Sequence, residues 1–424
     1  MKSVGRHVLV EYYGCDSEIL GDASLLEKAV VKAAKDAGAT VLNSTFHQFA
    51  PVGTSGVVVI QESHLAIHTW PEFKYAAVDL FTCGDMIDPW VSFNSLKESL
   101  KSEFSSPLEM LRGQFELLPE VNHDEVWEHE DAPQIPPKYT RNVWFTEYEE
   151  DHGLSLRHKG DKLFDKQSDF QRVTVLDTYK FGKMLTLDGA IMTTENDEYV
   201  YHEMITHPAL QLVGGPKRVL IVGGGDGGAA RECLRYDTLE EVVVAEIDEM
   251  VVDVSKEFLP SISSSFGDKR TTLAIGDGIK YVAEAEAGSF DVVIVDSTDP
   301  VGPAEGLFSY DFYRHCHRLL RDGGVMVVQS ESPRYNEQAF AGVNKCNREL
   351  FGEANVFPYL AYVPTYPTGM WSFSMAVKGD AKPSSLDSAA IQAFAEKHDL
   401  SYFNGDIHSA AFALPTFARK LLEG

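Results

Sequence analysis

Four short apolar runs in the second half of the chain, each followed by an acidic residue, constrain the fold most strongly. Runs of this length are typical of strands buried on both faces of a sheet, and helix-like stretches separate them. This alternation predicts an open, mostly parallel sheet with helices on both faces, a Rossmann-like doubly wound domain over residues 211–424. The four runs are Arg218–Val222, Glu241–Ala245, Thr272–Ile275 and Asp291–Val295.

A glycine-rich loop follows the first run. Its residues, Gly223–Gly228, fit the pattern G-x-G-x-x-G between a strand and a helix. Glycines at these positions let a ligand approach the backbone near a helix N-terminus, so the loop predicts a nucleotide-like ligand. The pattern alone does not choose between a dinucleotide and an S-adenosyl compound.

Acidic residues follow all four runs where each strand would end. In an open parallel sheet the carboxyl ends of the strands meet at one edge, where ligands bind. Several acids there repel a phosphate-rich cofactor such as NAD and favour a cationic ligand. Helix capping explains one or two acids at such positions, but not four of them together with Asp299. The four acids are Asp226, Glu246, Asp277 and Asp296.

The rest of the chain divides at a segment of different composition. Residues 118–139 are rich in proline and acidic side chains without periodicity, which predicts a linker. Residues 140–210 carry strand-like runs separated by turn residues and predict a small antiparallel β subdomain. Residues 1–117 predict a separate α/β domain, with helices on one face of a sheet. In that domain Ser24–Glu27 fits a capping box that opens a helix, whose apolar face includes Leu26.

The charge and cysteine content exclude several classes of protein. The chain has 37 basic and 64 acidic side chains, a formal charge of −27, which argues against a nucleic-acid partner and suits a cationic substrate. Five scattered cysteines without a C-x-x-C pattern predict a reducing compartment and no structural metal. The N-terminus has no apolar signal core, and no run is long enough to span a bilayer. We therefore expect a soluble, cytoplasmic protein.

The triplet Glu62-Ser63-His64 follows the apolar run Val57–Ile60. Serine beside histidine usually marks a turn or a surface hydrogen bond. The triplet also permits a chemical step in which the Ser63 hydroxyl attacks the Glu62 carbonyl. β-Elimination from the resulting ester then splits the chain and leaves residue 63 as a pyruvoyl group. This carbonyl electrophile forms a Schiff base with an amine and serves as an electron sink.

Residues 1–115 resemble the bacterial-type S-adenosylmethionine decarboxylases, which are pyruvoyl enzymes. The resemblance implies an α/β sandwich-type domain that cleaves itself between Glu62 and Ser63. The stretches that carry it, in this order, are Ser44–His47, Glu62–Glu72 and Asp79–Gly84.

Three further residues match functional positions of that family. Ser55 and His68 match its processing residues, with His68 also in the catalytic set, and Cys83 matches its catalytic proton donor. One geometric difficulty remains, because five residues of straight strand would place Ser63 and His68 roughly 16 Å apart. We therefore expect the chain to bend or reverse between them.

Residues 140–424 resemble the spermidine synthases, an aminopropyltransferase family. The resemblance is carried by the glycine-rich loop and by the stretches Glu246–Asp248, Gly276–Gly278, Asp296–Pro300 and Pro364–Pro367. It implies that Asp296 takes the proton of the attacking amine, helped by Tyr201, while Asp299 anchors cationic nitrogen. The other implied substrate-binding residues are Gln171, His202, Asp226, Glu246, Asp277, Gly278, Gln329 and Tyr366.

The two resemblances together imply a bifunctional enzyme of polyamine biosynthesis. The first domain would decarboxylate S-adenosylmethionine with a pyruvoyl group made from Ser63, without a metal. The second would transfer the aminopropyl group of that product to putrescine, giving spermidine and 5′-methylthioadenosine. Both families commonly form oligomers, so we expect a homodimer or a larger assembly.

Several alternatives stay open at this point. The second half is also compatible with a methyltransferase, although the Asp296–Pro300 stretch argues against it. In a second alternative, the first half decarboxylates ornithine or arginine on the same scaffold. In a third, it is an uncleaved regulatory module. Agmatine, cadaverine or a longer polyamine would replace putrescine in a reshaped pocket.

Overall fold

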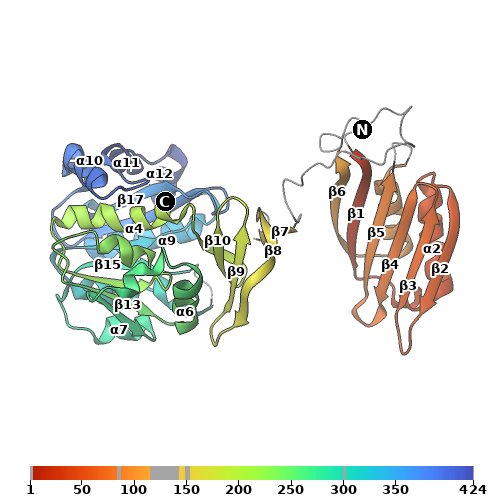
Figure 1. The fold of residues 1–424 in the computed structure, drawn as a ribbon, viewed down its shortest axis with the longest axis horizontal. Coiled ribbons are helices and arrows are strands. Elements are labelled where there is room, and N and C mark those ends of the chain that lie inside the picture. Colours follow the sequence, from red (N-terminus) through yellow and green to blue (C-terminus); the bar gives the residue numbers. More distant parts are fainter. Residues whose placement is uncertain (1–2, 84–86, 115–142, 149–152, 299–301, 424) are drawn as a thin grey trace, which may run out of the picture. The chain divides into compact units, whose positions relative to one another are not determined.

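The computed structural model describes residues 3–83, 87–114, 143–148, 153–298 and 302–423. The chain divides into two compact units, Met1–Pro137 and Lys138–Gly424. The mixed α/β class is confirmed, with three separate sheets (Figure 1). The predicted linker lies outside the described residues.

The front unit is one antiparallel sheet of six strands in the order β2-β3-β4-β5-β1-β6. Helices α2 and α3 pack against each other and share one core with the sheet (Figure 1). The strands are β1 (Ser3–Tyr13), β2 (Val41–Gln48), β3 (Thr54–Ile60), β4 (Ser63–Trp70), β5 (Tyr75–Cys83) and β6 (Phe104–Gln114). The helices are α1 (Ser17–Gly21), α2 (Ala23–Asp36) and α3 (Pro89–Ser99).

Helix α2 begins at Ala23, and its capping residue lies two residues before the predicted one. Asp22 caps it, because its carboxylate accepts hydrogen bonds from the backbone N–H groups of Ser24 and Leu25. The expectation that Ser24 caps the helix is therefore wrong, and Glu27 instead accepts a hydrogen bond from Ser44 of β2. The predicted apolar face is present, with Leu26 fully buried.

Strand β4 runs straight from Ser63 to Trp70, paired with β3 on one side and β5 on the other. The predicted bend between Ser63 and His68 is therefore wrong. The reason is that continuous pairing on both sides satisfies the backbone of β4 only while the strand stays extended.

The back unit begins with an antiparallel sheet of five strands in the order β11-β10-β9-β8-β7. Its apolar face packs on helix α6, where Val173 and Leu185 share a core with Val251 and Val254. The strands are β7 (Val143–Tyr148), β8 (Gly153–Gln167), β9 (Arg172–Thr178), β10 (Lys183–Leu187) and β11 (Ala190–Thr194).

A seven-stranded sheet in the order β14-β13-β12-β15-β16-β18-β17 forms the rest of this unit (Figure 1). The first five of these strands are parallel to one another, β18 runs antiparallel to β16, and β17 runs antiparallel to β18. Its strands are β12 (Arg218–Gly223), β13 (Glu241–Glu246), β14 (Thr271–Ile275), β15 (Phe290–Asp296), β16 (Leu320–Gln329), β17 (Val356–Tyr362) and β18 (Met370–Val377).

Helices cover both faces of this sheet, as the alternating pattern predicts. In β12, Val219 and Ile221 face a core shared with α4 and α5, whereas Leu220 and Val222 face a core shared with α7 and α8. The helices are α4 (Glu198–Val213), α5 (Gly228–Cys233), α6 (Glu249–Phe258), α7 (Gly278–Glu284), α8 (Tyr310–Leu319), α9 (Glu337–Phe351), α10 (Ser388–Lys397), α11 (Gly405–Ala411) and α12 (Thr416–Glu423).

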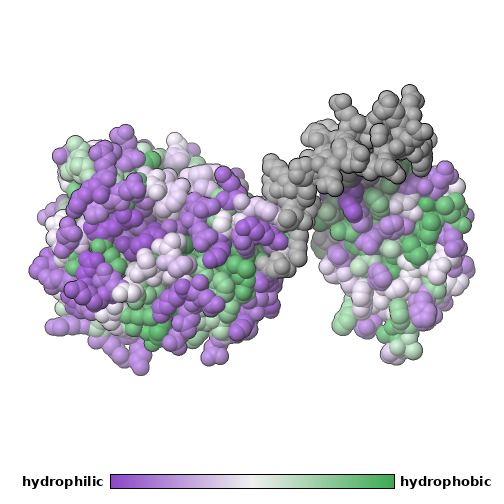
Figure 2. All heavy atoms as spheres, in the orientation of Figure 1, coloured by the Kyte–Doolittle hydropathy of each residue, from purple (hydrophilic) through white to green (hydrophobic). Residues whose placement is uncertain are grey.

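The visible surface of the back unit is largely hydrophilic, with apolar residues confined to patches (Figure 2). This agrees with the large excess of acidic over basic side chains in the sequence. Within the described residues, none of the helices combines the length and the apolar character needed to cross a bilayer.

Adjacent leucines of α2 provide a matched test of the front core. Leu26 is fully buried, whereas Leu25 is 43% exposed. Leu26→Ala should cost about 2–5 kcal/mol of local stability through the cavity it leaves, and Leu25→Ala should cost little. Hydrogen exchange of the β1 amides in the full chain, followed by mass spectrometry, measures this. Equal exchange in the two variants would contradict the assigned core.

Candidate functional site

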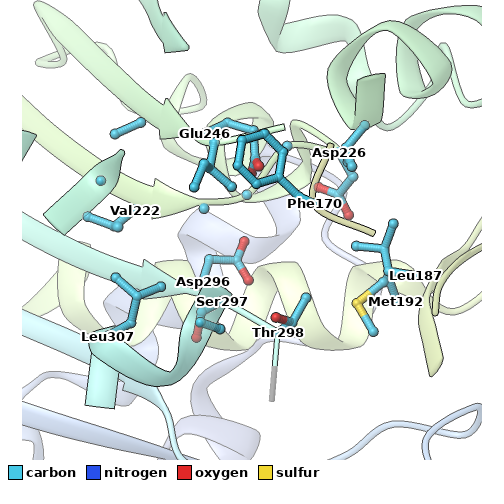
Figure 3. A pocket seen from close by; sticks show the side chains of 18 of the residues that line it. Phe170, Leu187, Met192, Val222, Asp226, Glu246, Asp296, Ser297, Thr298 and Leu307 are labelled. Carbon is cyan, nitrogen blue, oxygen red and sulfur yellow. The ribbon is translucent and has the colours of Figure 1, made fainter. Parts of the chain in front are cut away.

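The carboxyl ends of β12, β13 and β15 border a pocket of the back unit. The glycine-rich loop forms its floor, and the small sheet supplies apolar side chains on the opposite side. Figure 3 shows Phe170, Leu187 and Met192 around the same space as the acidic residues. The pocket therefore combines an acidic edge with an apolar wall, which suits a ligand that has both a flat apolar part and a positive charge.

All four acids predicted at the strand ends line this pocket, and Figure 3 labels Asp226, Glu246 and Asp296 among them. Asp277 also caps α7, accepting from the backbone N–H groups of Ile279 and Lys280, so the capping explanation holds for this residue. Glu246 begins no helix and ends β13 directly. The predicted Gly278 lines the pocket as the first residue of α7.

Asp296 ends β15 and accepts a hydrogen bond from the hydroxyl of Tyr201 at 2.8 Å. Burial, and then the charge of Asp226, raise the pKa of Asp296 to about 6. A carboxylate with such a pKa is ionised at neutral pH and binds a proton more readily than an exposed one. The pair predicted from the sequence, Asp296 and Tyr201, is thus in direct contact.

His202 follows Tyr201 on α4 and contacts Asp226 in the glycine-rich loop, with Nε2 3.1 Å from Oδ2. Burial opposes the charge on the ring, but Asp226 and Glu198 raise the pKa of His202 well above its usual value. The pKa of Asp226 is lowered, because the attraction of His202 outweighs the effect of burial. The two acids Asp226 and Asp296 therefore have pKa values shifted in opposite directions.

Glu246 and Gln171 meet through Asp248. The Glu246 carboxylate accepts the backbone N–H of Asp248 at 2.9 Å, and Gln171 donates to Asp248 Oδ2 at 3.1 Å. Burial, and then the charges of Asp248 and Asp296, raise the pKa of Glu246 to about 7. The second oxygen of Glu246 lies near Gly225, where an added Cβ would approach it to 2.8 Å.

A second pocket continues from the first through Met192, Tyr201 and Tyr366, which line both. Gln329 lines it at the end of β16 and donates to Glu331 at 3.1 Å. Asp299, predicted to anchor an amine here, lies outside the described residues. The two pockets are therefore adjacent, with the apolar wall in the first and polar side chains such as Gln329 in the second.

Sequence reasoning missed several residues of these pockets. Glu147 and Glu331 are both buried and line the second pocket. Glu147 comes from β7, so only the folding of the small sheet onto the larger domain brings it there. Glu331 stands two residues after the predicted Gln329, so its place in the sequence was a signal for it. The apolar wall carried no signal, because its residues come from separate strands.

The front unit places its predicted residues in two groups. Ser55 and His68 are paired in register across β3 and β4, and Ser55 Oγ lies 2.7 Å from His68 Nδ1. Ser63 lies at the other end of β4, beside Cys83, whose backbone N–H donates to the Glu62 carbonyl at 2.8 Å. The two groups are separated by five residues of straight strand, roughly 16 Å.

The fold and the pocket of the back unit define a class of enzyme. The strand order, the glycine-rich loop and the acid at the end of β13 are typical of a Rossmann-like domain that binds a nucleoside. The row of carboxylates and the second polar pocket indicate a cationic nucleoside and an amine as substrates rather than a dinucleotide. The back unit is thus a transferase-type domain for an S-adenosyl compound.

Comparison with known proteins specifies the family. The family model "Spermine/spermidine synthase domain" matches residues 198–384, and "Spermidine synthase tetramerisation domain" matches residues 143–195. A polyamine aminopropyltransferase of Thermoanaerobacter sp. (strain X514) is 45% identical over 282 residues, 66% of this chain and 99% of that protein. One of Methanocaldococcus jannaschii is 41% identical over 280 residues, 66% and 94% of the respective chains.

Solved structures of spermidine synthases also resemble this chain. A spermidine synthase in complex with the transition state analogue AdoDATO has a TM-score of 0.64 and 35% identity, covering 70% of this chain and 99% of that one. The spermidine synthase from Thermotoga maritima has a TM-score of 0.63 and 34% identity, covering 72% and 99%. The family model "S-adenosylmethionine decarboxylase" matches residues 6–113.

The chain therefore belongs to the polyamine aminopropyltransferase family, with an S-adenosylmethionine decarboxylase domain joined in front of its spermidine synthase domain. The predicted fusion of two enzyme families is confirmed.

Two glycines of the back unit provide a matched test of the loop geometry. Gly223 has φ +84°, and a Cβ there would lie 2.1 Å from the carbonyl oxygen of Asp296. Gly323 has φ +80° but open space around its Cβ. Gly323→Ala should cost about 1–2 kcal/mol from backbone strain alone, whereas Gly223→Ala should cost about 1–3 kcal/mol more because β12 and β15 must separate. Denaturant unfolding of both variants measures the difference, and equal losses would contradict the close approach.

Proposed function

We propose that the chain catalyses two consecutive steps of spermidine synthesis. The front domain decarboxylates S-adenosylmethionine, and the back domain transfers the aminopropyl group of the product to putrescine, releasing 5′-methylthioadenosine. The observation that carries the proposal is the pocket in which Asp226, Glu246 and Asp296 surround one space beside an apolar wall. The domain division proposed is 1–117, 118–139, 140–210 and 211–424.

In the back domain the acids divide the work of binding. Glu246, at the end of β13, is placed to accept hydrogen bonds from a ribose hydroxyl pair. Asp226, kept ionised by His202, attracts the positive aminopropyl end of decarboxylated S-adenosylmethionine. Phe170, in the connection between β8 and β9, and Leu187 of β10 provide the apolar side of a cleft for the adenine.

Asp296 is proposed as the proton acceptor for the attacking amine. An alkyl amine has a pKa of about 10.4 and arrives protonated at neutral pH, so it cannot attack until the proton leaves. Asp296 lines the first pocket, and the hydroxyl of Tyr201, which lines both pockets, fixes its orientation. Because the pKa of Asp296 is raised to about 6, the rate should rise with pH through this range and fall in acid.

The far end of putrescine would lie in the second pocket. Buried Glu147 and Glu331 bring two carboxyl groups to that pocket, and Gln329 and Tyr366 add polar groups. A diamine with a cationic far end suits this lining. We propose that Asp299 also contributes there.

In the front domain the proposal begins with self-cleavage between Glu62 and Ser63. Ser63 has a φ of +149°, a strained conformation for a residue with a side chain. The carbonyl that its hydroxyl would attack already accepts the backbone N–H of Cys83, a donor placed to stabilise an oxyanion. Elimination leaves a dehydroalanine at residue 63, and water converts it to the pyruvoyl group with release of ammonia. The carbonyl of this group binds the substrate amine and accepts the electron pair released with CO₂.

The decarboxylase site is proposed to need two chains. Ser55 and His68 lie at one end of β4 and Ser63 with Cys83 at the other, so the four cannot meet around one substrate within a chain. A second copy that presents its Ser55–His68 end to Ser63 completes the set. The match to a tetramerisation domain supports an oligomer, and we propose a homodimer or a larger assembly.

We also propose that the enzyme works in the cytoplasm. Cys83 can donate a proton as part of the site only while its thiol is reduced, which a reducing compartment ensures.

Co-expression of two inactive variants tests the shared site. Ser63→Ala has no residue to convert, and His68→Ala lacks the processing histidine, so each should stay as an uncut chain without decarboxylase activity. In a mixed oligomer the His68→Ala chain keeps Ser63 and receives His68 from its partner. A denaturing gel should then show a fragment of 62 residues and one of the remaining 362 of 424. Absence of cleavage and CO₂ release in the mixture would contradict a shared site.

Asp296→Asn separates the two activities. The change keeps the size of the side chain but removes the proton acceptor, so aminopropyl transfer should fall by about 10²–10⁴-fold. Self-cleavage and CO₂ release should continue, and decarboxylated S-adenosylmethionine should accumulate, as measured by mass spectrometry. Transfer at the parental rate would show that Asp296 is not the base. Loss of decarboxylation as well would show that the two domains depend on each other.

A further inference from the structure

A row of four charged side chains runs from the surface of the back unit to its pocket. Arg231 donates to both oxygens of Glu198, from Nη1 to Oε1 and from Nη2 to Oε2, each at 2.8 Å. Glu198 Oε2 lies 2.5 Å from His202 Nδ1, and His202 Nε2 lies 3.1 Å from Asp226 Oδ2. The signs alternate along this charge row, from Arg231 through Glu198 and His202 to Asp226.

Both nitrogens of the His202 ring face a carboxylate. An ionised carboxylate only accepts hydrogen bonds, so each ring nitrogen must carry a proton and the ring is an imidazolium. The side chains of Glu198 and His202 are 8% and 3% exposed, so little water competes for these contacts. Glu198 belongs to the first turn of α4 one helical turn before His202, and the two-point contact with Arg231 fixes the carboxylate.

The charge on His202 acts on the proposed base. Burial and the charge of Asp226 raise the pKa of Asp296, while the positive ring of His202 lowers it. Among the residues that the structure describes, Tyr201, which donates to Asp296 at 2.8 Å, and Glu246, whose own pKa is raised by Asp296, also act on this acid. The positive ring of His202 thus partly offsets the rise in the pKa of Asp296 that burial and the neighbouring acids cause.

We propose that Glu198 is a positioning residue for aminopropyl transfer. Clamped by Arg231, it holds His202 as a fixed cation against Asp226, so that Asp226 stays negative toward the substrate and Asp296 stays ionised at neutral pH. The inference deepens the proposed function and rests on Asp296 as its base. Glu198 touches neither substrate nor reacting atoms and acts through His202.

Glu198→Gln tests this through the pH dependence of kcat for transfer. The variant keeps the size of the side chain but removes one of the two negative charges that hold the second proton on His202. Asp296 works in its ionised form, so activity is lost as pH falls through its pKa. Losing the neighbouring cation raises that pKa, and the acidic limb should move upward by about one pH unit. Transfer at pH 6 should fall about fivefold, while transfer at high pH stays near parental. A uniform loss at every pH would overturn the proposal.

Two further variants separate positioning from a structural role. Glu198→Asp keeps the negative charge and should return the acidic limb toward the parental pH. Arg231→Lys replaces the two-point clamp by a single contact and should move the limb upward by a smaller amount. It provides the test if Glu198→Gln does not accumulate as folded protein, and an unmoved limb in that variant would count against the proposal.

A double-mutant cycle with His202→Gln tests whether Glu198 acts through His202. His202→Gln should move the limb upward on its own, and adding Glu198→Gln should move it no further. A second, equal shift in the double variant would show that Glu198 acts without His202 and would overturn the proposal.

The outcome for the base itself is distinguishable. If Asp296→Asn leaves the acidic limb in place, the proposed base is wrong. If the limb depends on Asp296 but Glu198→Gln leaves it unmoved, only the positioning role fails.

Discussion

The back unit depends on holding several carboxylates in an apolar pocket. Burying a negative charge is costly unless a partner compensates it. The fold gives each acid a different partner: His202 for Asp226, the hydroxyl of Tyr201 for Asp296, and the backbone N–H of Asp248 for Glu246. Only the partner of Asp226 carries a full positive charge, so the pocket keeps a negative balance that a cationic nucleoside or amine can complete.

The architecture follows from this requirement. Parallel strands bring the acids to one edge, and glycines in the loop after β12 let that loop lie against the end of β15. The first turns of α4 supply Glu198, Tyr201 and His202 from one short stretch of sequence. In the front unit the sheet instead separates the candidate site residues. Its straight strand β4 keeps Ser63 and His68 apart, so the proposed chemistry there must come from association between chains.

Local patterns in the sequence were enough to predict the acid-lined edge. The four apolar runs, the glycine-rich loop and the acids after each run depend on short stretches, and the structure brings these acids together. Contacts between distant elements were not predictable in this way. Glu147 enters the second pocket from β7, and Arg231 reaches Glu198 from α5. The bend expected in β4 was wrong because β3 and β5 pair along this strand on both sides and keep it extended.

The central claim is that one chain carries S-adenosylmethionine through decarboxylation and then aminopropyl transfer. Incubation of the purified full-length protein with carboxyl-labelled S-adenosylmethionine and putrescine tests it most directly. The account predicts that each spermidine formed is matched by one labelled CO₂ and one 5′-methylthioadenosine, without added decarboxylated substrate. Formation of S-adenosylhomocysteine and a methylated amine, with the carboxyl label retained, would contradict it.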